Sequence, residues 1–206
     1  MAYIEAAQRR EQMIAAARIA LADLGVSNTS IRAVAKQAGV PLGTLQYVFP
    51  TKESLLKAVI EDVVDEIAGI LGSSANVDSG LAHAIHEGIS TFWSRLVSGH
   101  AGLQLMQYEL TTYALRTANQ QALARWQYER YTDVVAQWCQ QAANKAGETC
   151  SLPFTRLARI IVAAIDGLIL QYVCDPNESR SREDLKTVAA MIVEAAKIEK
   201  VVSASP

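Results

Sequence analysis

The stretch Ile31-Arg-Ala-Val-Ala-Lys-Gln-Ala-Gly-Val-Pro-Leu-Gly-Thr-Leu-Gln-Tyr-Val-Phe49 predicts two short amphipathic helices joined by a turn at Gly39. The apolar residues of each helix share one face at helical spacing. They are Ile31, Val34, Ala35 and Ala38 in the first helix, and Leu45, Val48 and Phe49 in the second. Gly39 can adopt the positive φ of a tight turn, and Pro41 suits the first turn of the second helix. This is the arrangement of a helix-turn-helix.

An ordinary helical hairpin in a core is the alternative, because sequences rich in Ala, Leu and Val imitate the motif. Ala35 is small where two crossing helices would come closest, and Val40 can fill the space beneath the turn. These two positions fit a helix-turn-helix, and the flanking segments decide between the interpretations.

The composition is that of a globular protein with an uneven charge distribution. Half of the 206 residues are hydrophobic, which is enough for a sizeable core. The formal net charge is −2, but residues 1–57 hold seven Lys/Arg against four Asp/Glu, a balance of +3. Residues 58–206 hold twelve against seventeen, a balance of −5. A basic segment on an acidic body fits a small DNA-contacting end.

Cysteine usage and hydropathy indicate a cytoplasmic protein. The cysteines are three in number and widely spaced, which suits reduced thiols. No zinc-binding cysteine pair occurs, and His83 and His86 lack a third ligand at suitable spacing, so we expect no metal and no cofactor. The N-terminus lacks a signal-peptide pattern, and Asp166 interrupts the most apolar stretch, so we expect no membrane partner.

Helical periodicity recurs along almost the whole chain, and no alternating strand pattern occurs, so the expected fold class is all-α with about nine helices. The expected helices are 9–24, the two within 31–49, a long helix from about 52 to the loop 72–80, and then 81–97, 103–117, 120–146, 155–174 and 182–200.

Capping residues mark several of these helix ends. Gly25 and Gly147 suit C-terminal caps, and Ser30 and Thr51 suit N-caps. Ser181, with Asp184 three residues later, resembles a capping box and places the start of the last helix at about 182.

With these surroundings, the chain resembles the TetR family of transcriptional regulators over residues 9–60. The resemblance rests on seven segments in order: Ile14-Ala-Ala-Ala17, Leu24-Gly25, Thr29-Ser-Ile31, Val34-Ala35, Ala38-Gly-Val40, Gly43-Thr-Leu45 and Phe49-Pro-Thr-Lys-Glu53. A looser resemblance to one C-terminal subgroup rests on Tyr108-Glu-Leu, Ala114-Leu-Arg116, Ile165-Asp-Gly-Leu-Ile-Leu-Gln171 and Asp175-Pro176.

The resemblance implies a fold and a mode of action. It implies an N-terminal three-helix helix-turn-helix DNA-binding domain, residues 1–52, joined by the fourth helix to an α-helical ligand-binding and dimerisation domain, residues 53–206. It also implies a homodimer in which helices eight and nine of two subunits form a four-helix bundle. Helices four to eight would enclose an inducer pocket, and inducer binding would change the distance between the two DNA-reading heads.

The resemblance places Thr44 and Lys52 at phosphate-contacting positions, with Ser30 close to the DNA backbone. The chemistry is independently sensible, because a hydroxyl, an ammonium and a helix N-terminus each donate to phosphate oxygens. Arg32 can read guanine, and Gln46 can read adenine. The full set of expected DNA-binding residues is Ser30, Arg32, Leu42, Gly43, Thr44, Gln46, Tyr47 and Lys52.

Two of these positions depart from the family pattern. Gln46 stands where the family usually has Tyr, and Leu42 stands where it often has Lys. Since these side chains are expected on the outward face of the second helix, the operator sequence cannot be carried over from the family.

Aromatic and soft side chains are concentrated in the expected helices 81–97, 103–117 and 120–146, which suits a pocket for an apolar or planar ligand. Plain core packing is the alternative. Glu109 and Arg130 could orient a polar group. Asp166 in an apolar helix must find a partner, in the pocket or in the dimer bundle. The expected ligand-binding residues are Phe92, Trp93, Met106, Glu109, Tyr113, Trp126, Arg130 and Asp166.

The apolar residues of the last two helices are candidates for the dimer face, where burial against a partner competes with burial within the subunit. They are Tyr172, Leu185, Val188, Ala189, Ile192 and Ala196.

Together these features predict a ligand-responsive transcriptional regulator, most simply a repressor. It would bind a near-palindromic operator as a homodimer and be released by a small apolar or aromatic inducer. We expect no enzyme, because no nucleophile elbow, phosphate loop or metal-ligand cluster is visible. A small-molecule carrier whose hairpin has lost DNA affinity is the alternative from another class, and acid–base chemistry around Asp166 and Glu109 is the third.

Overall fold

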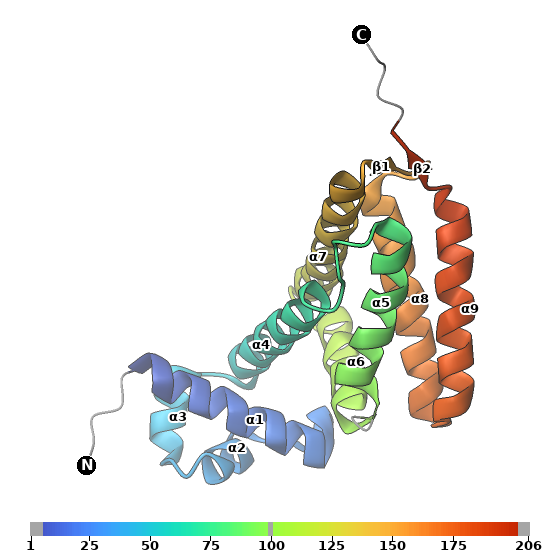
Figure 1. Cartoon of the computed structure of the whole chain (residues 1–206). Coiled ribbons are helices and arrows are strands. Elements are labelled where there is room, and N and C mark those ends of the chain that lie inside the picture. Colours follow the sequence, from blue (N-terminus) through green and yellow to red (C-terminus); the bar gives the residue numbers. More distant parts are fainter. Residues whose placement is uncertain (1–5, 99–100, 202–206) are drawn as a thin grey trace. The chain divides into compact units, whose positions relative to one another are not determined.

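The computed structural model describes residues 6–98 and 101–201. In this part of the chain it has nine α-helices: α1 (Ala6–Asn28), α2 (Ile31–Gln37), α3 (Leu42–Val48), α4 (Lys52–Gly72), α5 (Leu81–Phe92), α6 (Ala101–Arg116), α7 (Gln121–Ala146), α8 (Phe154–Cys174) and α9 (Glu178–Ala196) (Figure 1). A π-helical turn, η1 (Trp93–Val97), continues α5. The strands β1 (Glu148–Thr149) and β2 (Glu199–Lys200) pair antiparallel and were not predicted. The predicted all-α class is confirmed.

The described residues divide into two compact units. The first comprises residues 6–65 and 105–127, and the second comprises 66–98, 101–104 and 128–201. The chain crosses from one unit to the other within α4, α6 and α7. The domain boundary between residues 52 and 53 stays a prediction.

The first three helices share a well-buried core. α1 packs against α2, and α2 packs against α3. The fully buried side chains of these helices include Met13, Ala17, Leu21, Val34 and Leu45. Beyond α3, the buried Phe49 ring lies under the Arg10 guanidinium, 5.4 Å from ring centroid to the guanidinium carbon. The predicted apolar faces therefore lie inside this unit.

The turn between α2 and α3 closes as the sequence predicts. Gly39 has a φ of 65°. Its N–H donates to the Lys36 carbonyl at 3.2 Å, and the Val40 N–H donates to the Ala35 carbonyl at 3.1 Å. This pair of bonds is the Schellman motif, which needs the left-handed conformation at the glycine. Pro41 is the N-cap of α3 rather than its first helical residue, because its ψ of 143° is extended.

The predicted N-caps of α2 and α4 are present. The Ser30 hydroxyl accepts from the Ala33 N–H, at 3.1 Å. Before α4, the Thr51 hydroxyl accepts from the Ser54 N–H at 3.1 Å, and the Ser54 hydroxyl accepts from the Thr51 N–H at 3.2 Å. Each bond satisfies an amide that the helix itself leaves open.

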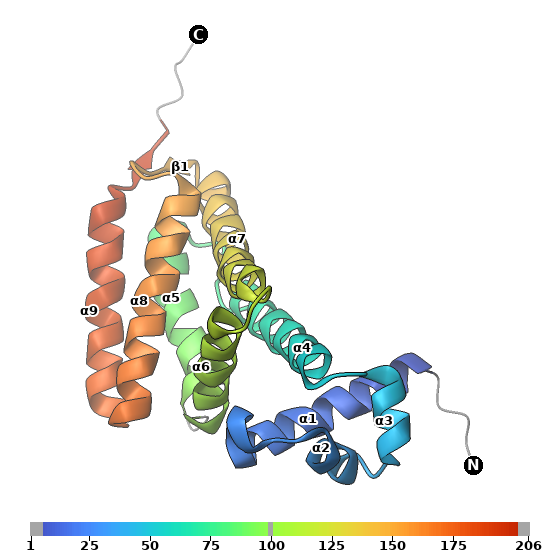
Figure 2. The ribbon, with the colours of Figure 1, turned by 180° about the vertical axis from the view of Figure 1, so that it is seen from behind.

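In the second unit, α5, α8 and α9 lie side by side (Figures 1 and 2). Their facing side chains are buried, with Ile85 and Ile89 from α5, Leu157 and Ile161 from α8, and Ala189 from α9. α8 is long and apolar enough to cross a membrane by length and composition alone. Here its buried side forms part of the core of this unit.

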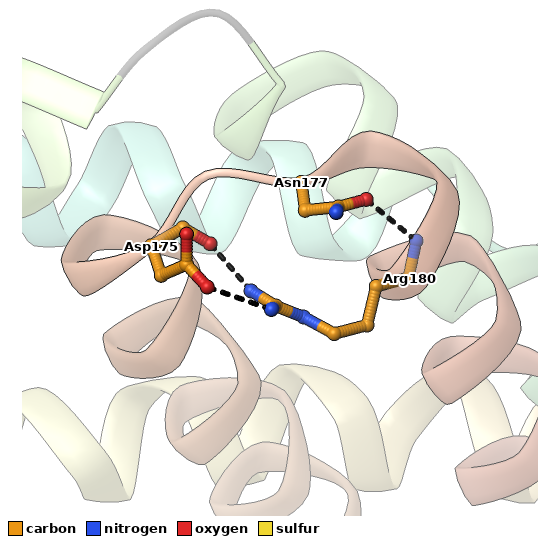
Figure 3. Close-up of polar contacts among 3 residues, drawn as sticks. All are labelled: Asp175, Asn177 and Arg180. Atoms are coloured by element: carbon orange, nitrogen blue, oxygen red, sulfur yellow. Dashed lines mark hydrogen bonds and ion pairs between the residues drawn. The ribbon is translucent and has the colours of Figure 1, made fainter.

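The start of α9 differs from the prediction. The helix begins at Glu178, and its N-cap is Asn177, whose side-chain oxygen accepts from the Arg180 N–H at 3.0 Å (Figure 3). The Arg180 guanidinium also reaches back to the Asp175 carboxylate, at 2.7 Å. Ser181 is therefore not the cap but a buried residue of the first turn. Asn177 and Ser181 are both residue types that favour the N-cap position, and here the capping bond is made by Asn177.

The end of α9 also differs, because the helix stops at Ala196 instead of continuing to 200. Lys197 takes the left-handed conformation, and the following residues pair as β2 with β1. Glu148 of β1 accepts from the Leu81 N–H at 2.8 Å and from the Lys200 ammonium at 3.0 Å. Burial alone would raise the pKa of Glu148, but these two bonds outweigh it and lower the pKa.

Candidate nucleic-acid interface

The helix-turn-helix presents a polar and aromatic outer face. Tyr47 is 89% exposed, and Gln46, Gly43, Arg32 and Ser30 are also exposed. Leu42, Thr44 and Lys52 are half-buried. The Tyr47 ring, almost fully in water, contributes little to the core and is accessible to a binding partner. The eight predicted DNA-binding residues thus all lie at or near the surface.

Ser30 combines two functions at the start of α2. Its oxygen accepts the capping bond from Ala33, which leaves the hydroxyl hydrogen able to donate. The first backbone N–H groups of α2 point out of its N-terminus, next to Ser30, where an anion is favoured. This end of α2 has the chemistry of a phosphate contact.

The corner between α1 and α2 is held by side chains from two other helices. Gly25 interrupts α1 with a φ of 76° and a ψ of 161°. The next N–H, that of Val26, donates to the Glu109 carboxylate of α6 at 2.7 Å. The Val26 carbonyl accepts from the Lys52 ammonium of α4 at 2.8 Å. Thr29 is buried, and its hydroxyl lies 2.7 Å from the Gly25 carbonyl oxygen.

Lys52 therefore has a structural partner besides any phosphate. An ammonium carries three N–H donors, so the bond to Val26 leaves two for other acceptors. Sequence reasoning missed both the Lys52 bond and the Glu109 bond. Glu109 lies 83 residues from Val26 along the chain, and no local pattern signals such a pairing.

The eight predicted ligand-binding residues are divided between the units. The first unit holds Met106, Glu109, Tyr113 and Trp126, and the second holds Phe92, Trp93, Arg130 and Asp166. In the first unit, Trp126 lines two open hollows of about 450 and 500 Å³.

In the second unit, Asp166 has found a partner inside its own chain. The Tyr128 hydroxyl donates to the Asp166 carboxylate at 2.9 Å. Burial, and then the Asp166 charge, raise the pKa of Tyr128, so the phenol stays neutral and keeps its hydrogen. Among the described residues, the indole N–H groups of Trp93 and Trp138 are buried without a hydrogen-bond acceptor. A buried donor of this kind can be satisfied by an ordered water or by a ligand.

Most of the six predicted dimer residues are buried within one chain. They are Leu185, Ala189, Ile192 and Ala196 on α9, and Tyr172 on α8, while Val188 is half-buried. The Tyr172 hydroxyl donates to Glu178 at 2.6 Å, and this bond, with that from Ser98, lowers the pKa of Glu178. The assignment of these six residues to a dimer face stays a prediction.

No group of three or more potential metal ligands occurs in the described ranges. His83 pairs with Glu87 at 3.0 Å rather than with His86.

Two family descriptions match the chain. "Bacterial regulatory proteins, tetR family" matches residues 13–59, and "Tetracyclin repressor-like, C-terminal domain" matches residues 78–195, which is more than half of the sequence. The chain belongs to the TetR family. It is a DNA-binding transcriptional regulator, since this family and the matched relatives consist of transcriptional regulators and not of enzymes.

The chain is also similar to individual regulators of known description. The TetR-family chain is 25% identical over 180 residues to the HTH-type nicotine-responsive transcriptional repressor HdnoR of Paenarthrobacter nicotinovorans, covering 87% of this chain and 91% of that protein. The fold is similar to that of a transcriptional regulator from Rhodococcus sp. Rha1, with a TM-score of 0.73, 21% identity, and coverage of 91% and 97%. It is also similar to FadR of Bacillus subtilis in complex with stearoyl-CoA, with a TM-score of 0.66, 20% identity, and coverage of 90% and 98%.

Proposed function

We propose that this TetR-family regulator is a cytoplasmic repressor that binds a near-palindromic operator through residues 30–52. The observation that carries the proposal is the exposed face of α3, on which the almost fully exposed Tyr47 and the exposed Gln46 stand beside Gly43. Gly43 has open space around its Cα, so the backbone of α3 can approach a base pair or phosphate closely.

The residues of this surface divide into two groups by chemistry. Ser30, Thr44 and Lys52 offer donors to phosphate, which fix the register of the protein on the duplex. Arg32 and Gln46 can form bidentate bonds to guanine and adenine, and Tyr47 can contact a thymine methyl or a phosphate. The second group sets the sequence preference, whereas the first supplies affinity to any duplex.

A near-palindromic operator requires a two-fold symmetric dimer. α8 carries an exposed stripe at helical spacing, formed by Ile160, Ala163, Gly167 and Leu170. On α9, Met191 is 63% exposed on the side away from the buried residues. We propose that these residues form the homodimer face. Ala163 and Gly167 are small and would let two helices approach closely. The larger apolar side chains of the face would lose their contact with water on dimerisation.

The inducer is proposed to be a small apolar or aromatic molecule with a polar group. We propose that the Asp166 carboxylate, to which Tyr128 donates, orients the donor group of the ligand. The buried indole donors of Trp93 and Trp138 would suit a ligand acceptor. HdnoR is described as nicotine-responsive, which makes nicotine a reasonable probe. Phe92 and Arg130, and in the first unit Met106, Tyr113 and Trp126, remain candidates.

Selection of bound duplexes from a random pool should recover a near-palindromic sequence. Gln46→Ala should then weaken discrimination at one base pair of each half-site by about 1–3 kcal/mol, because one bidentate contact is lost. Its free energy of unfolding should change by less than about 0.5 kcal/mol, since Gln46 is exposed. The matched control is Gln141→Ala, an exposed glutamine of α7. Equal loss of affinity for every base would remove the reading function of Gln46.

Leu170→Glu should convert a dimer into a monomer, because it places a charge in an apolar interface that excludes water. Sedimentation velocity at micromolar concentration measures this. Leu115→Glu is the control, because Leu115 is similarly exposed but lies on α6. A wild-type monomer, or a Leu170→Glu variant that remains dimeric, would contradict the proposed face.

Nicotine should change the tryptophan fluorescence of the protein and weaken its binding to the selected duplex. Asp166→Asn should reduce nicotine affinity about tenfold, because a charged hydrogen-bond acceptor is lost. Asp133→Asn, at an exposed carboxylate of α7, should leave the affinity unchanged. Stearate serves as a second probe, with a long apolar chain and a carboxylate in place of a hydrogen-bond donor. Binding of neither probe, or equal nicotine binding by the Asp166 variant, would overturn this assignment.

A further inference from the structure

A carboxylate of α6 accepts a backbone hydrogen bond near the junction between α1 and α2. The ψ of Gly25 turns the following N–H away from the axis of α1, so Val26 needs an acceptor from outside the helix. Glu109 provides it at 2.7 Å, a distance typical of a hydrogen bond to a charged group. The bond is partly buried, and the Val26 side chain is buried.

The approach of Glu109 depends on the absence of a side chain at Gly25. A Cβ at this position would lie 3.3 Å from Glu109 Oε2 and 3.4 Å from Oε1. With a φ of 76°, the position also disfavours any L-residue with a side chain. Gly25 therefore has two functions. It permits the positive φ, and it leaves space for the Glu109 carboxylate.

Opposite charges hold the two ends of Val26. Its N–H donates to the Glu109 carboxylate, and its carbonyl accepts from the Lys52 ammonium. Thr29 lies three residues later, and its backbone N–H donates to the Gly25 carbonyl at 3.2 Å. Ser30 follows at once and caps α2. The direction in which α2 leaves α1 is thus set by the two non-local bonds to Val26 and by the local bonds of Thr29 and Ser30.

We propose that Glu109 is a positioning residue for DNA binding, which holds the corner so that α2 and α3 present Ser30, Gln46 and Tyr47 together. This inference rests on the proposed function of residues 30–52. Glu109 and the helix-turn-helix belong to the same compact unit. If the corner loosens, only a fraction of molecules has the DNA-binding arrangement, and the apparent affinity falls by that fraction.

The direction of the change in DNA affinity distinguishes a positioning role of Glu109 from a purely electrostatic effect of its charge. DNA is a polyanion, so removal of a negative charge from its binding partner by itself strengthens binding. Loss of the positioning bond acts in the opposite direction. Asp23 of α1 is an exposed carboxylate in the same unit and provides the matched control for charge.

The experiment compares Glu109→Ala, Glu109→Gln and Asp23→Asn with the wild type. Affinity for the selected duplex is measured by fluorescence anisotropy, below the melting temperature of every variant. Glu109→Ala should bind about tenfold more weakly, because Val26 loses its acceptor. Glu109→Gln keeps an oxygen at the same reach and should stay within about threefold of the wild type. Asp23→Asn should bind equally or more tightly. Equal or tighter binding by Glu109→Ala would overturn the proposal.

Hydrogen exchange at the Val26 amide provides a second readout that needs no DNA. Exchange should be faster in Glu109→Ala than in the wild type, and unchanged in Asp23→Asn. Unchanged Val26 protection in the folded Glu109→Ala variant would also overturn the proposal. If the wild type selects no duplex, the proposed function fails, and faster Val26 exchange would still establish that Glu109 holds the corner. If Glu109→Ala does not fold, Glu109→Gln provides the test. The glutamine oxygen should still accept from the Val26 N–H, so a Glu109→Gln variant that loses both DNA affinity and Val26 protection would contradict the proposal.

Discussion

The bond between the Val26 N–H and the Glu109 carboxylate is the interaction on which, in our proposal, the arrangement of α2 and α3 depends. It is made where Gly25 breaks α1, so it satisfies a backbone donor that the helix cannot. Lys52 satisfies the carbonyl of the same residue from the other side. Because both partners are charged and the site is partly buried, each bond is stronger than a neutral hydrogen bond in water.

The second unit uses the same arrangement at another helix end. Gly80 precedes α5 with a φ of 89°, and the next N–H, that of Leu81, donates to the Glu148 carboxylate at 2.8 Å. A Cβ on Gly80 would lie 3.2 Å from that carboxylate. In both places a glycine with positive φ exposes one amide and makes room for a glutamate from far along the chain. Each compact unit therefore has one helix end that is fixed by a non-local carboxylate.

Sequence reasoning predicted the local features and missed the non-local ones. The turn at Gly39, the caps at Ser30 and Thr51, and the buried Val34, Ala35, Leu45 and Phe49 follow from nearest neighbours and helical spacing, which the sequence contains directly. The predicted start of α9 is wrong because Asn177 and Ser181 both belong to residue types that cap helices well, and their relative strength depends on tertiary contacts. The bond between Glu109 and Val26 joins residues 83 positions apart, and no pattern near either residue signals it. The dimer face stays a prediction, and the apolar residues of α9 also pack on α5 and α8.

Hydroxyl-radical footprinting of the selected duplex tests whether residues 30–52 of two subunits read DNA together. We expect two protected segments on one face of the duplex, related by the symmetry of the sequence and separated by whole helical turns of about 10 base pairs. Tyr47→Ala should weaken both segments equally without loss of the folded dimer, because Tyr47 is exposed and lies outside the proposed dimer face. A single protected segment, or protection that survives unchanged in Tyr47→Ala, would contradict the proposal that two subunits read DNA together.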